Sequence, residues 1–133
     1  MTTEAEFQLY LDAVEGAVFE YKEARNRYDF EELVKYCVAL ANEGGGKIIL
    51  GVTDRRPRTV VGTAAFAEPG RTESGLFDRL NHKISIEEYW HDGRRALIVH
   101  VPGRAAGRAW EYGGTFLMRA GDSLRGMSDA ELQ

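Results

Sequence analysis

The chain has 133 residues, of which 44% are hydrophobic and 29% charged, and its formal net charge is −4. This length fits one compact domain, residues 1–133, whose apolar content supports a core without metal or disulfide staples; the single cysteine, Cys37, excludes a disulfide framework. No apolar run approaches the roughly 20 residues that span a bilayer and no secretory signal is present, so we expect a cytoplasmic protein without a membrane partner.

The first predicted elements are a short helix and a strand. Residues 4–14 place apolar side chains among acids, which predicts an amphipathic helix that Gly16 ends. The segment 18–23 alternates and contains aromatic and β-branched residues, which favours a strand. Its aromatic face should enter the core, while Glu20 and Lys22 share the other face.

The clearest helix begins at Asp29, an N-cap residue with Glu32 at the capping-box position. Apolar residues then recur every three or four positions, and Gly44 should end the helix in a left-handed conformation. The apolar run that follows, at 47–53, predicts a strand covered on both faces and therefore central in a sheet.

The middle of the chain predicts a return strand, a helix and a hairpin. Residues 59–63 can pair back onto the central strand. Thr72 is a potential N-cap for a helix over 73–83, which would turn Leu76, Phe77 and Leu80 inward. Two strands, 84–91 and 94–101, are separated by Asp92-Gly93, the strongest short-range signal for a β-hairpin.

The last segment predicts another hairpin and the start of a helix. Residues 108–112 and 115–120 flank Gly113-Gly114, which favours a turn between two strands. Ser128 begins a second capping box with Glu131, close to the end of the sequence. A helix signal at this place predicts a domain truncated before a C-terminal region.

The sequence does not match the patterns of two common kinds of binding site, the phosphate-binding loop and the zinc site. The run Gly44-Gly45-Gly46-Lys47 connects a helix to a strand, whereas a phosphate-binding loop connects a strand to a helix. ATP binding is therefore doubtful, and the glycines are explained by a helix stop and a tight turn. The three histidines show no ligand spacing, which argues against a zinc site.

Acidic residues near two strands form the first candidate site. Glu15, Glu20 and Asp54 could supply oxygen ligands to Mg²⁺ or Mn²⁺, and Lys22 could stabilise charge on a reacting phosphate. A metal-dependent phosphodiesterase needs such a set of residues. An acidic sheet edge without catalytic function would contain the same residues, so the spacing alone leaves both interpretations open.

Arginines and aromatic residues form the second candidate site. Residues 94–126 contain six arginines against two acids, whereas residues 1–32 contain nine acids against three bases. Arginine binds phosphates and aromatic rings stack on bases, so this region predicts nucleic-acid contacts. The alternative is that the aromatic rings pack on the sheet and the arginines are solvated. The candidates are Arg104, Arg108, Trp110, Tyr112 and Arg119.

Four segments together resemble the Schlafen AlbA_2 domain, also called the divergent AAA-4 domain. They are Glu15–Lys22 (EGAVFEYK), Ala39–Gly46 (ALANEGGG), Ile48–Asp54 (IILGVTD) and Phe116–Ser123 (FLMRAGDS). The resemblance spans about residues 12–132. It implies an α+β fold with a mixed, mainly antiparallel sheet flanked by helices.

The resemblance also implies functions. In bacteria and archaea such domains often precede a winged helix-turn-helix, in proteins labelled transcriptional regulators. Animal relatives include endoribonucleases that cut transfer RNA with three acids, two of which match Glu15 and Glu20, with Asp54 the nearest match for the third. Those enzymes build their site within a larger, paired core, which a single domain would match only as a homodimer.

These observations leave three hypotheses. The first is a nucleic-acid-binding or regulatory domain that contacts DNA or RNA. The second is a metal-dependent endoribonuclease acting on structured RNA. The third is a protein-interaction or dimerisation domain without nucleic-acid contacts.

Overall fold

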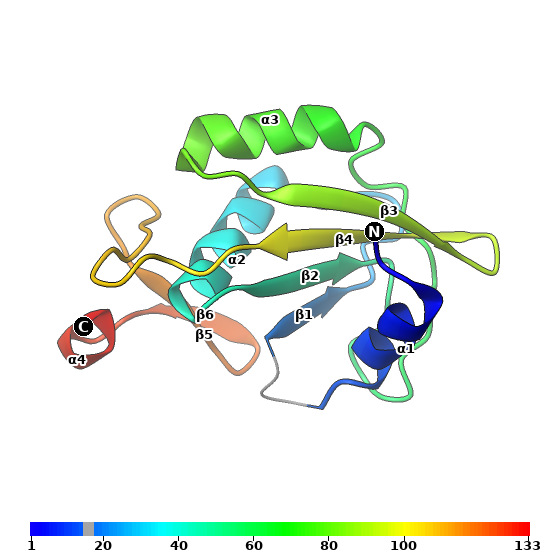
Figure 1. The fold of residues 1–133 in the computed structure, drawn as a ribbon, viewed down its shortest axis with the longest axis horizontal. Helices are drawn as coiled ribbons and strands as arrows, with labels where there is room; N and C mark the ends of the chain where they lie inside the picture. The colour runs from blue at the N-terminus through cyan, green and yellow to red at the C-terminus, as the bar shows by residue number, and fades with distance from the viewer. Residues whose placement is uncertain (15–17) are drawn as a thin grey trace.

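The computed structural model describes residues 1–14 and 18–133, which form a four-stranded sheet with helices on both faces (Figure 1). A two-stranded hairpin and a short helix follow the sheet along the chain. The elements in chain order are α1 (Glu4–Asp12), β1 (Phe19–Lys22), α2 (Phe30–Asn42), β2 (Gly46–Leu50), α3 (Pro69–Leu80), β3 (Ser85–His91), β4 (Arg94–Val101), β5 (Leu117–Ala120), β6 (Ser123–Gly126) and α4 (Asp129–Leu132).

The main sheet has the strand order β1-β2-β4-β3. The β1–β2 pair is parallel, and α2 forms the crossover that a parallel pair requires. The β2–β4 and β3–β4 pairs are antiparallel. The predicted α+β fold with a mixed, mainly antiparallel sheet is therefore confirmed. No helix in the described part of the chain is long and apolar enough to cross a bilayer.

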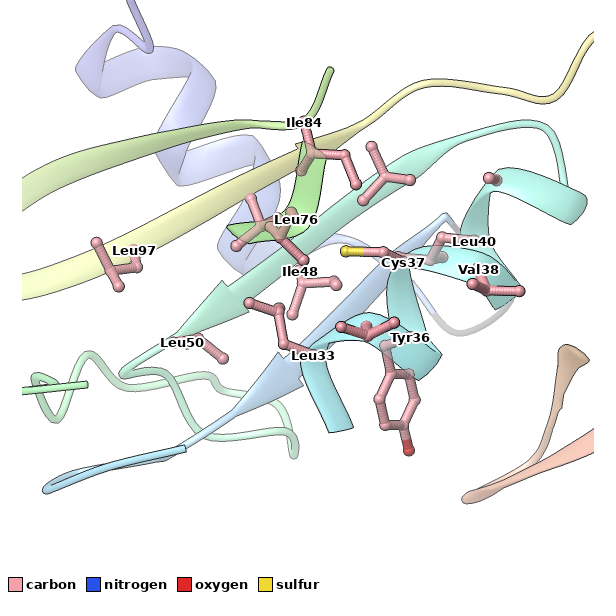
Figure 2. Packing of buried hydrophobic residues seen from close by; sticks show 14 of the residues in the cluster. Leu33, Tyr36, Cys37, Val38, Leu40, Ile48, Leu50, Leu76, Ile84 and Leu97 are labelled. Carbon is pink, nitrogen blue, oxygen red and sulfur yellow. The ribbon is translucent and has the colours of Figure 1, made fainter. Parts of the chain in front are cut away.

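Strand β2 is central and buried on both faces, as its uninterrupted apolar run predicts. Ile48 and Leu50 pack in the core that α2 and α3 cover, and Ile49 packs in the core that α1 covers. Figure 2 shows Ile48 and Leu50 close to the side chains of α2. Cys37 lies in the same core, where burial raises the pKa of its thiol and separates it from solvent.

The ends of α2 follow the predicted local rules. The Asp29 carboxylate accepts a hydrogen bond from the backbone N–H of Glu32 at 3.1 Å. Gly44 has φ +103°, and the N–H groups of Gly44 and Gly45 donate to the carbonyls of Ala41 and Leu40. This pattern is a Schellman motif, so the glycines end a helix as predicted.

The predicted β3–β4 hairpin and the last capping box are both confirmed. Asp92 and Gly93 have positive φ, at 49° and 75°, as a two-residue I′-type connection requires. The Ser128 hydroxyl accepts from the N–H of Glu131, and the Glu131 carboxylate accepts from the N–H of Ser128.

The predicted bounds of the third helix are wrong. Helix α3 begins at Pro69, because proline fixes a helical φ at the first position, and Thr72 lies inside the helix. It ends where Asn81 turns left-handed, with φ 56°. Leu76 is buried as expected, but Phe77 is 50% exposed and does not enter the core.

Two predicted hairpins are reduced to single bridges. The return strand 59–63 makes only the Val52–Val60 bridge, and the chain then turns so that the N–H of Thr63 donates to the carbonyl of Arg95. At Gly113-Gly114 the pairing is limited to Tyr112–Thr115. Strand β5 pairs instead with β6, across the turn at 121–122.

The first two elements agree with their predictions within two residues at each described end. Tyr21 is buried against the α1 side of the sheet, and its hydroxyl donates to the carbonyl of Tyr10 at 2.6 Å. The predicted stop at Gly16 lies outside the described residues.

Candidate functional site

The parallel β1–β2 pair brings two of the predicted acids to one place. Glu20 lies opposite Ile48 of β2, and Asp54 follows the end of that strand. Both side chains line a hollow of about 350 Å³. This convergence depends on strand order, which the sequence does not reveal. The other charged residues that line the hollow are Glu43, Arg58, Arg119 and Asp122.

The Glu20 carboxylate is held between two cations. It lies 3.2 Å from the guanidinium of Arg119 and 3.8 Å from the ammonium of Lys22. Burial raises the pKa of Glu20, the two cations oppose this effect, and the nearby charge of Asp54 adds to it. The net effect is a raised pKa, which is common for carboxylates at functional sites.

Lys22 supplies a fixed positive charge beside Glu20. Its ammonium donates to the Tyr36 hydroxyl at 3.3 Å and lies 4.7 Å from the centre of that ring. Burial lowers the pKa of Lys22, but the bond to Tyr36 and the neighbouring carboxylates outweigh burial and raise it. Lys22 can therefore stabilise an anion and is not suited to accept a proton at neutral pH.

Arg119 connects three elements around the acids. Its side chain, 15% exposed, reaches the Glu43 carboxylate at 3.1 Å and the carbonyl of Phe19 at 2.7 Å in addition to Glu20. The sequence pattern predicted Arg119 as a nucleic-acid contact and gave no prediction for Glu43. The available signal for Glu43 was its place at the end of α2, directly before the glycine turn that leads into the central strand.

Arg58, which was not predicted from the sequence, shapes the other wall of the hollow. Its guanidinium stacks on Tyr21, 3.8 Å from the ring centre, and donates to the carbonyls of Leu11 and Ala13 at the end of α1. Its Nε donates to the backbone carbonyl of Asp54 at 3.1 Å. Arg58 therefore fixes the loop that carries Asp54, and its place in an arginine-rich turn beside an acid was the available signal.

The described residues do not by themselves fit a Mg²⁺ or Mn²⁺ site. Over residues 1–14 and 18–133, no group of three or more His, Cys, Asp or Glu side chains is arranged to hold a metal ion. Glu20 is engaged with Arg119 and Lys22, which compete with a metal for its oxygens. Glu15, the third predicted ligand, lies outside the described residues.

The predicted basic and aromatic residues divide between several environments. Arg104 donates to the carbonyls of Glu131 and Leu132, so it caps α4. Trp110 is 7% exposed and stacks on His82, with ring centres 4.1 Å apart. The Tyr112 hydroxyl donates to Glu31 at 2.7 Å.

A groove of about 930 Å³ nevertheless brings three of these residues together. Arg108, Trp110 and Tyr112 line it, along with Arg79 and His82, neither of which was predicted. Its only acidic lining residue among those described is Glu111. The guanidinium of Arg108 is exposed and has no hydrogen bond or ion pair with any residue that the structure describes.

Comparisons with known proteins give a family and a fold. The model of the family described as Schlafen, AlbA_2 matches residues 15–128. No match was found among curated proteins. The structure is similar to the DIP2311 protein from Corynebacterium diphtheriae, with a TM-score of 0.69 and 22% identity. That alignment covers 96% of this chain but only 30% of DIP2311.

A second solved structure is the N-terminal domain of a protein from Nitrosomonas europaea, named as related to the ATP-dependent DNA helicase RecG. It has a TM-score of 0.58 and 22% identity, and the alignment covers 87% of this chain and 85% of that one. At such identities the two structures establish the fold alone. The family match spans most of the chain, which therefore belongs to the Schlafen AlbA_2 family.

Proposed function

We propose that this domain binds nucleic acid through the groove beside Arg108, as the binding part of a regulatory protein. The observation that supports this most is that aromatic rings line the groove together with the guanidinium of Arg108, which has no hydrogen bond or ion pair with any described residue. Arginine binds phosphate oxygens, and rings such as His82 offer a flat face to a base. The name of the RecG-related neighbour agrees with a nucleic-acid role.

Some residues of the groove would fix its structure, and others would contact the nucleic acid. Arg79 and Tyr112 both bind Glu31, and their hydrogen bonds lower the pKa of Glu31 to about 2. They therefore form a fixed wall. Arg108, exposed at the groove, would contact a phosphate, and His82 lies over the buried Trp110, which supports it as a stacking platform.

Replacing Arg108 with glutamine should weaken binding of single-stranded DNA or RNA by about tenfold, because it removes one charge-assisted hydrogen bond to a phosphate. The slope of log K against log salt should fall by about 1. Fluorescence anisotropy with a labelled oligonucleotide at several salt concentrations measures both quantities.

Arg94→Gln is the matched control, because it removes the same charge from an exposed residue at the start of β4, next to the β3–β4 turn (Figure 1). It should leave affinity almost unchanged. Equal reductions of affinity in Arg94→Gln and Arg108→Gln would show a general charge effect and no binding in the groove. Undetectable binding by the unaltered protein at low salt would contradict the proposed function.

An endoribonuclease is the second candidate, favoured by the position of Glu20 and Asp54 in one hollow, with the charge of Lys22 close to both. If it is correct, the protein cleaves structured RNA when Mg²⁺ or Mn²⁺ is supplied, and Glu20→Gln abolishes cleavage. Glu23→Gln, an exposed change next to β1, should have no effect. Cleavage that survives in Glu20→Gln, measured on gels, would exclude this hollow as the active site.

A further inference from the structure

A row of polar and basic side chains crosses three strands on the α1 side of the sheet. Lys47 of β2 lies directly opposite His100 of β4, which lies opposite Ser85 of β3. Directly paired residues project from the same face of a sheet. The ammonium of Lys47 lies 5.5 Å from the centre of the Tyr10 ring, which places it on the face that α1 covers in part.

These side chains line a surface hollow of about 550 Å³ together with Lys83. The lining residues that the structure describes include no acid. Lys83 is exposed and forms no ion pair or hydrogen bond through its side chain with any described residue. The hollow is therefore a basic site in a protein whose formal net charge is −4.

Glycine backbone forms part of the hollow's lining. A Cβ atom on Gly103 would lie 2.6 Å from the carbonyl oxygen of Gly44, and one on Gly45 would lie 2.7 Å from the nitrogen of Gly103. The turn after α2 and the loop after β4 therefore touch through their main chains. This part of the lining consists of peptide groups and has no side chains that would fill the hollow.

His100 is positioned by a contact with Glu87, which Thr2 holds in turn. Its Nε2 lies 3.0 Å from the carboxylate of Glu87, which also accepts hydrogen bonds from the N–H and hydroxyl of Thr2, both at 2.7 Å. Glu87 is thus occupied by Thr2 and His100, and it does not line the hollow. The contact with Glu87 fixes the orientation of the His100 ring, which lines the hollow.

We propose that this hollow binds a phosphate group, with Lys47 and Lys83 as the cations and the Ser85 hydroxyl as a further donor. An anion in the hollow would meet the two lysines without a competing carboxylate, because none of the described lining residues is an acid. The phosphate could belong to a free nucleotide or to a nucleic-acid backbone, since both present the same oxygens. The hollow and the groove of the proposed function have no lining residue in common. An experiment can therefore contradict one of the two proposals without contradicting the other.

The test is a titration of the ¹⁵N-labelled protein followed by NMR, first with inorganic phosphate and then with a short single-stranded oligonucleotide at low ionic strength. We expect saturable shifts of the amide signals of Ser85, His100 and Gly103. The Lys47→Gln/Lys83→Gln double variant should weaken phosphate binding by about tenfold for each cation removed. Its thermal unfolding shows whether it remains folded.

Lys35→Gln is the matched control, because Lys35 lies beside Tyr112, away from the hollow, and should not affect phosphate binding. Shifts caused by both ligands would assign the hollow to a nucleic-acid backbone, and shifts caused by phosphate alone would assign it to a free phosphate or nucleotide. Shifts absent with both ligands, or unchanged in the folded double variant, would overturn the proposal. Arg108→Gln should leave phosphate binding intact even where it weakens oligonucleotide binding.

Discussion

Replacing Asn42 with alanine should lower the free energy of unfolding by about 3 kcal/mol, because it leaves several buried backbone groups unpaired. Asn42, the last residue of α2, is 7% exposed. Its amide nitrogen donates to the carbonyls of Trp110 and Leu117 at 2.9 and 2.8 Å, and its oxygen accepts from the N–H of Trp110 at 2.7 Å. Urea unfolding followed by circular dichroism measures the change.

Two further variants make this prediction sharper. Asn42→Asp should also destabilise the protein, because a carboxylate cannot donate to the two carbonyls. Gln8→Ala, which removes an exposed amide bonded to Asp12, should change stability by less than about 0.5 kcal/mol. If Asn42→Ala unfolds at the same urea concentration as the unaltered protein, the prediction is wrong, and these hydrogen bonds do not stabilise the contact of Trp110 and Leu117 with α2.

Asn42 also shows why local rules predicted some elements and failed for others. The limits of α2 and the β3–β4 turn depend on residues within a few positions, so Asp29, Gly44 and Asp92-Gly93 were sufficient to predict them. The choice between two glycine-containing turns for the last hairpin is not local in this way. It depends on contacts of α2 with β5, such as the bond from Asn42 to Leu117, 75 positions apart.

For the candidate sites as well, the sequence predicted the types of residue but not their arrangement in space. The residue types of Glu20, Asp54 and Lys22 indicated a phosphate chemistry, and the family resemblance selected both acids. Their convergence required the β1–β2 pairing, and the engagement of Glu20 by Arg119, 99 positions away, required the tertiary fold. The pattern of arginines and aromatic rings could not separate Arg108, which no described residue pairs, from Arg104, which caps a helix.

Replacing Arg119 with methionine should destabilise the protein by about 2–3 kcal/mol, because it removes a cation shared by two partly buried carboxylates. The expected effect is below that for a fully buried pair, since Glu20 and Glu43 keep some exposure to solvent. Arg125→Met is the matched control on the neighbouring strand. Its ion pair with Glu131 is exposed to solvent and should contribute far less than the pairs of Arg119.

A double variant and a pH series separate the role of Glu20 from simple loss of packing. Without Arg119, the pKa of Glu20, already raised by burial above its ordinary value of 4.5, should rise further. A raised pKa contributes stability that is fully present below pH 4.5 and is lost as pH rises through the folded-state pKa. The stability deficit of Arg119→Met should therefore widen from acid to neutral pH.

Adding Glu20→Gln to Arg119→Met should recover part of the lost stability at neutral pH, because it removes one of the two partly buried carboxylates that lose Arg119 as a partner. At acid pH, where Glu20 is protonated, the same addition should have little effect. Unfolding free energies of the four proteins in this cycle provide the measurement. A stability deficit of Arg119→Met that is independent of pH and unchanged by Glu20→Gln would contradict this prediction. It would mean that Arg119 stabilises the protein through packing and not through its charge interaction with Glu20.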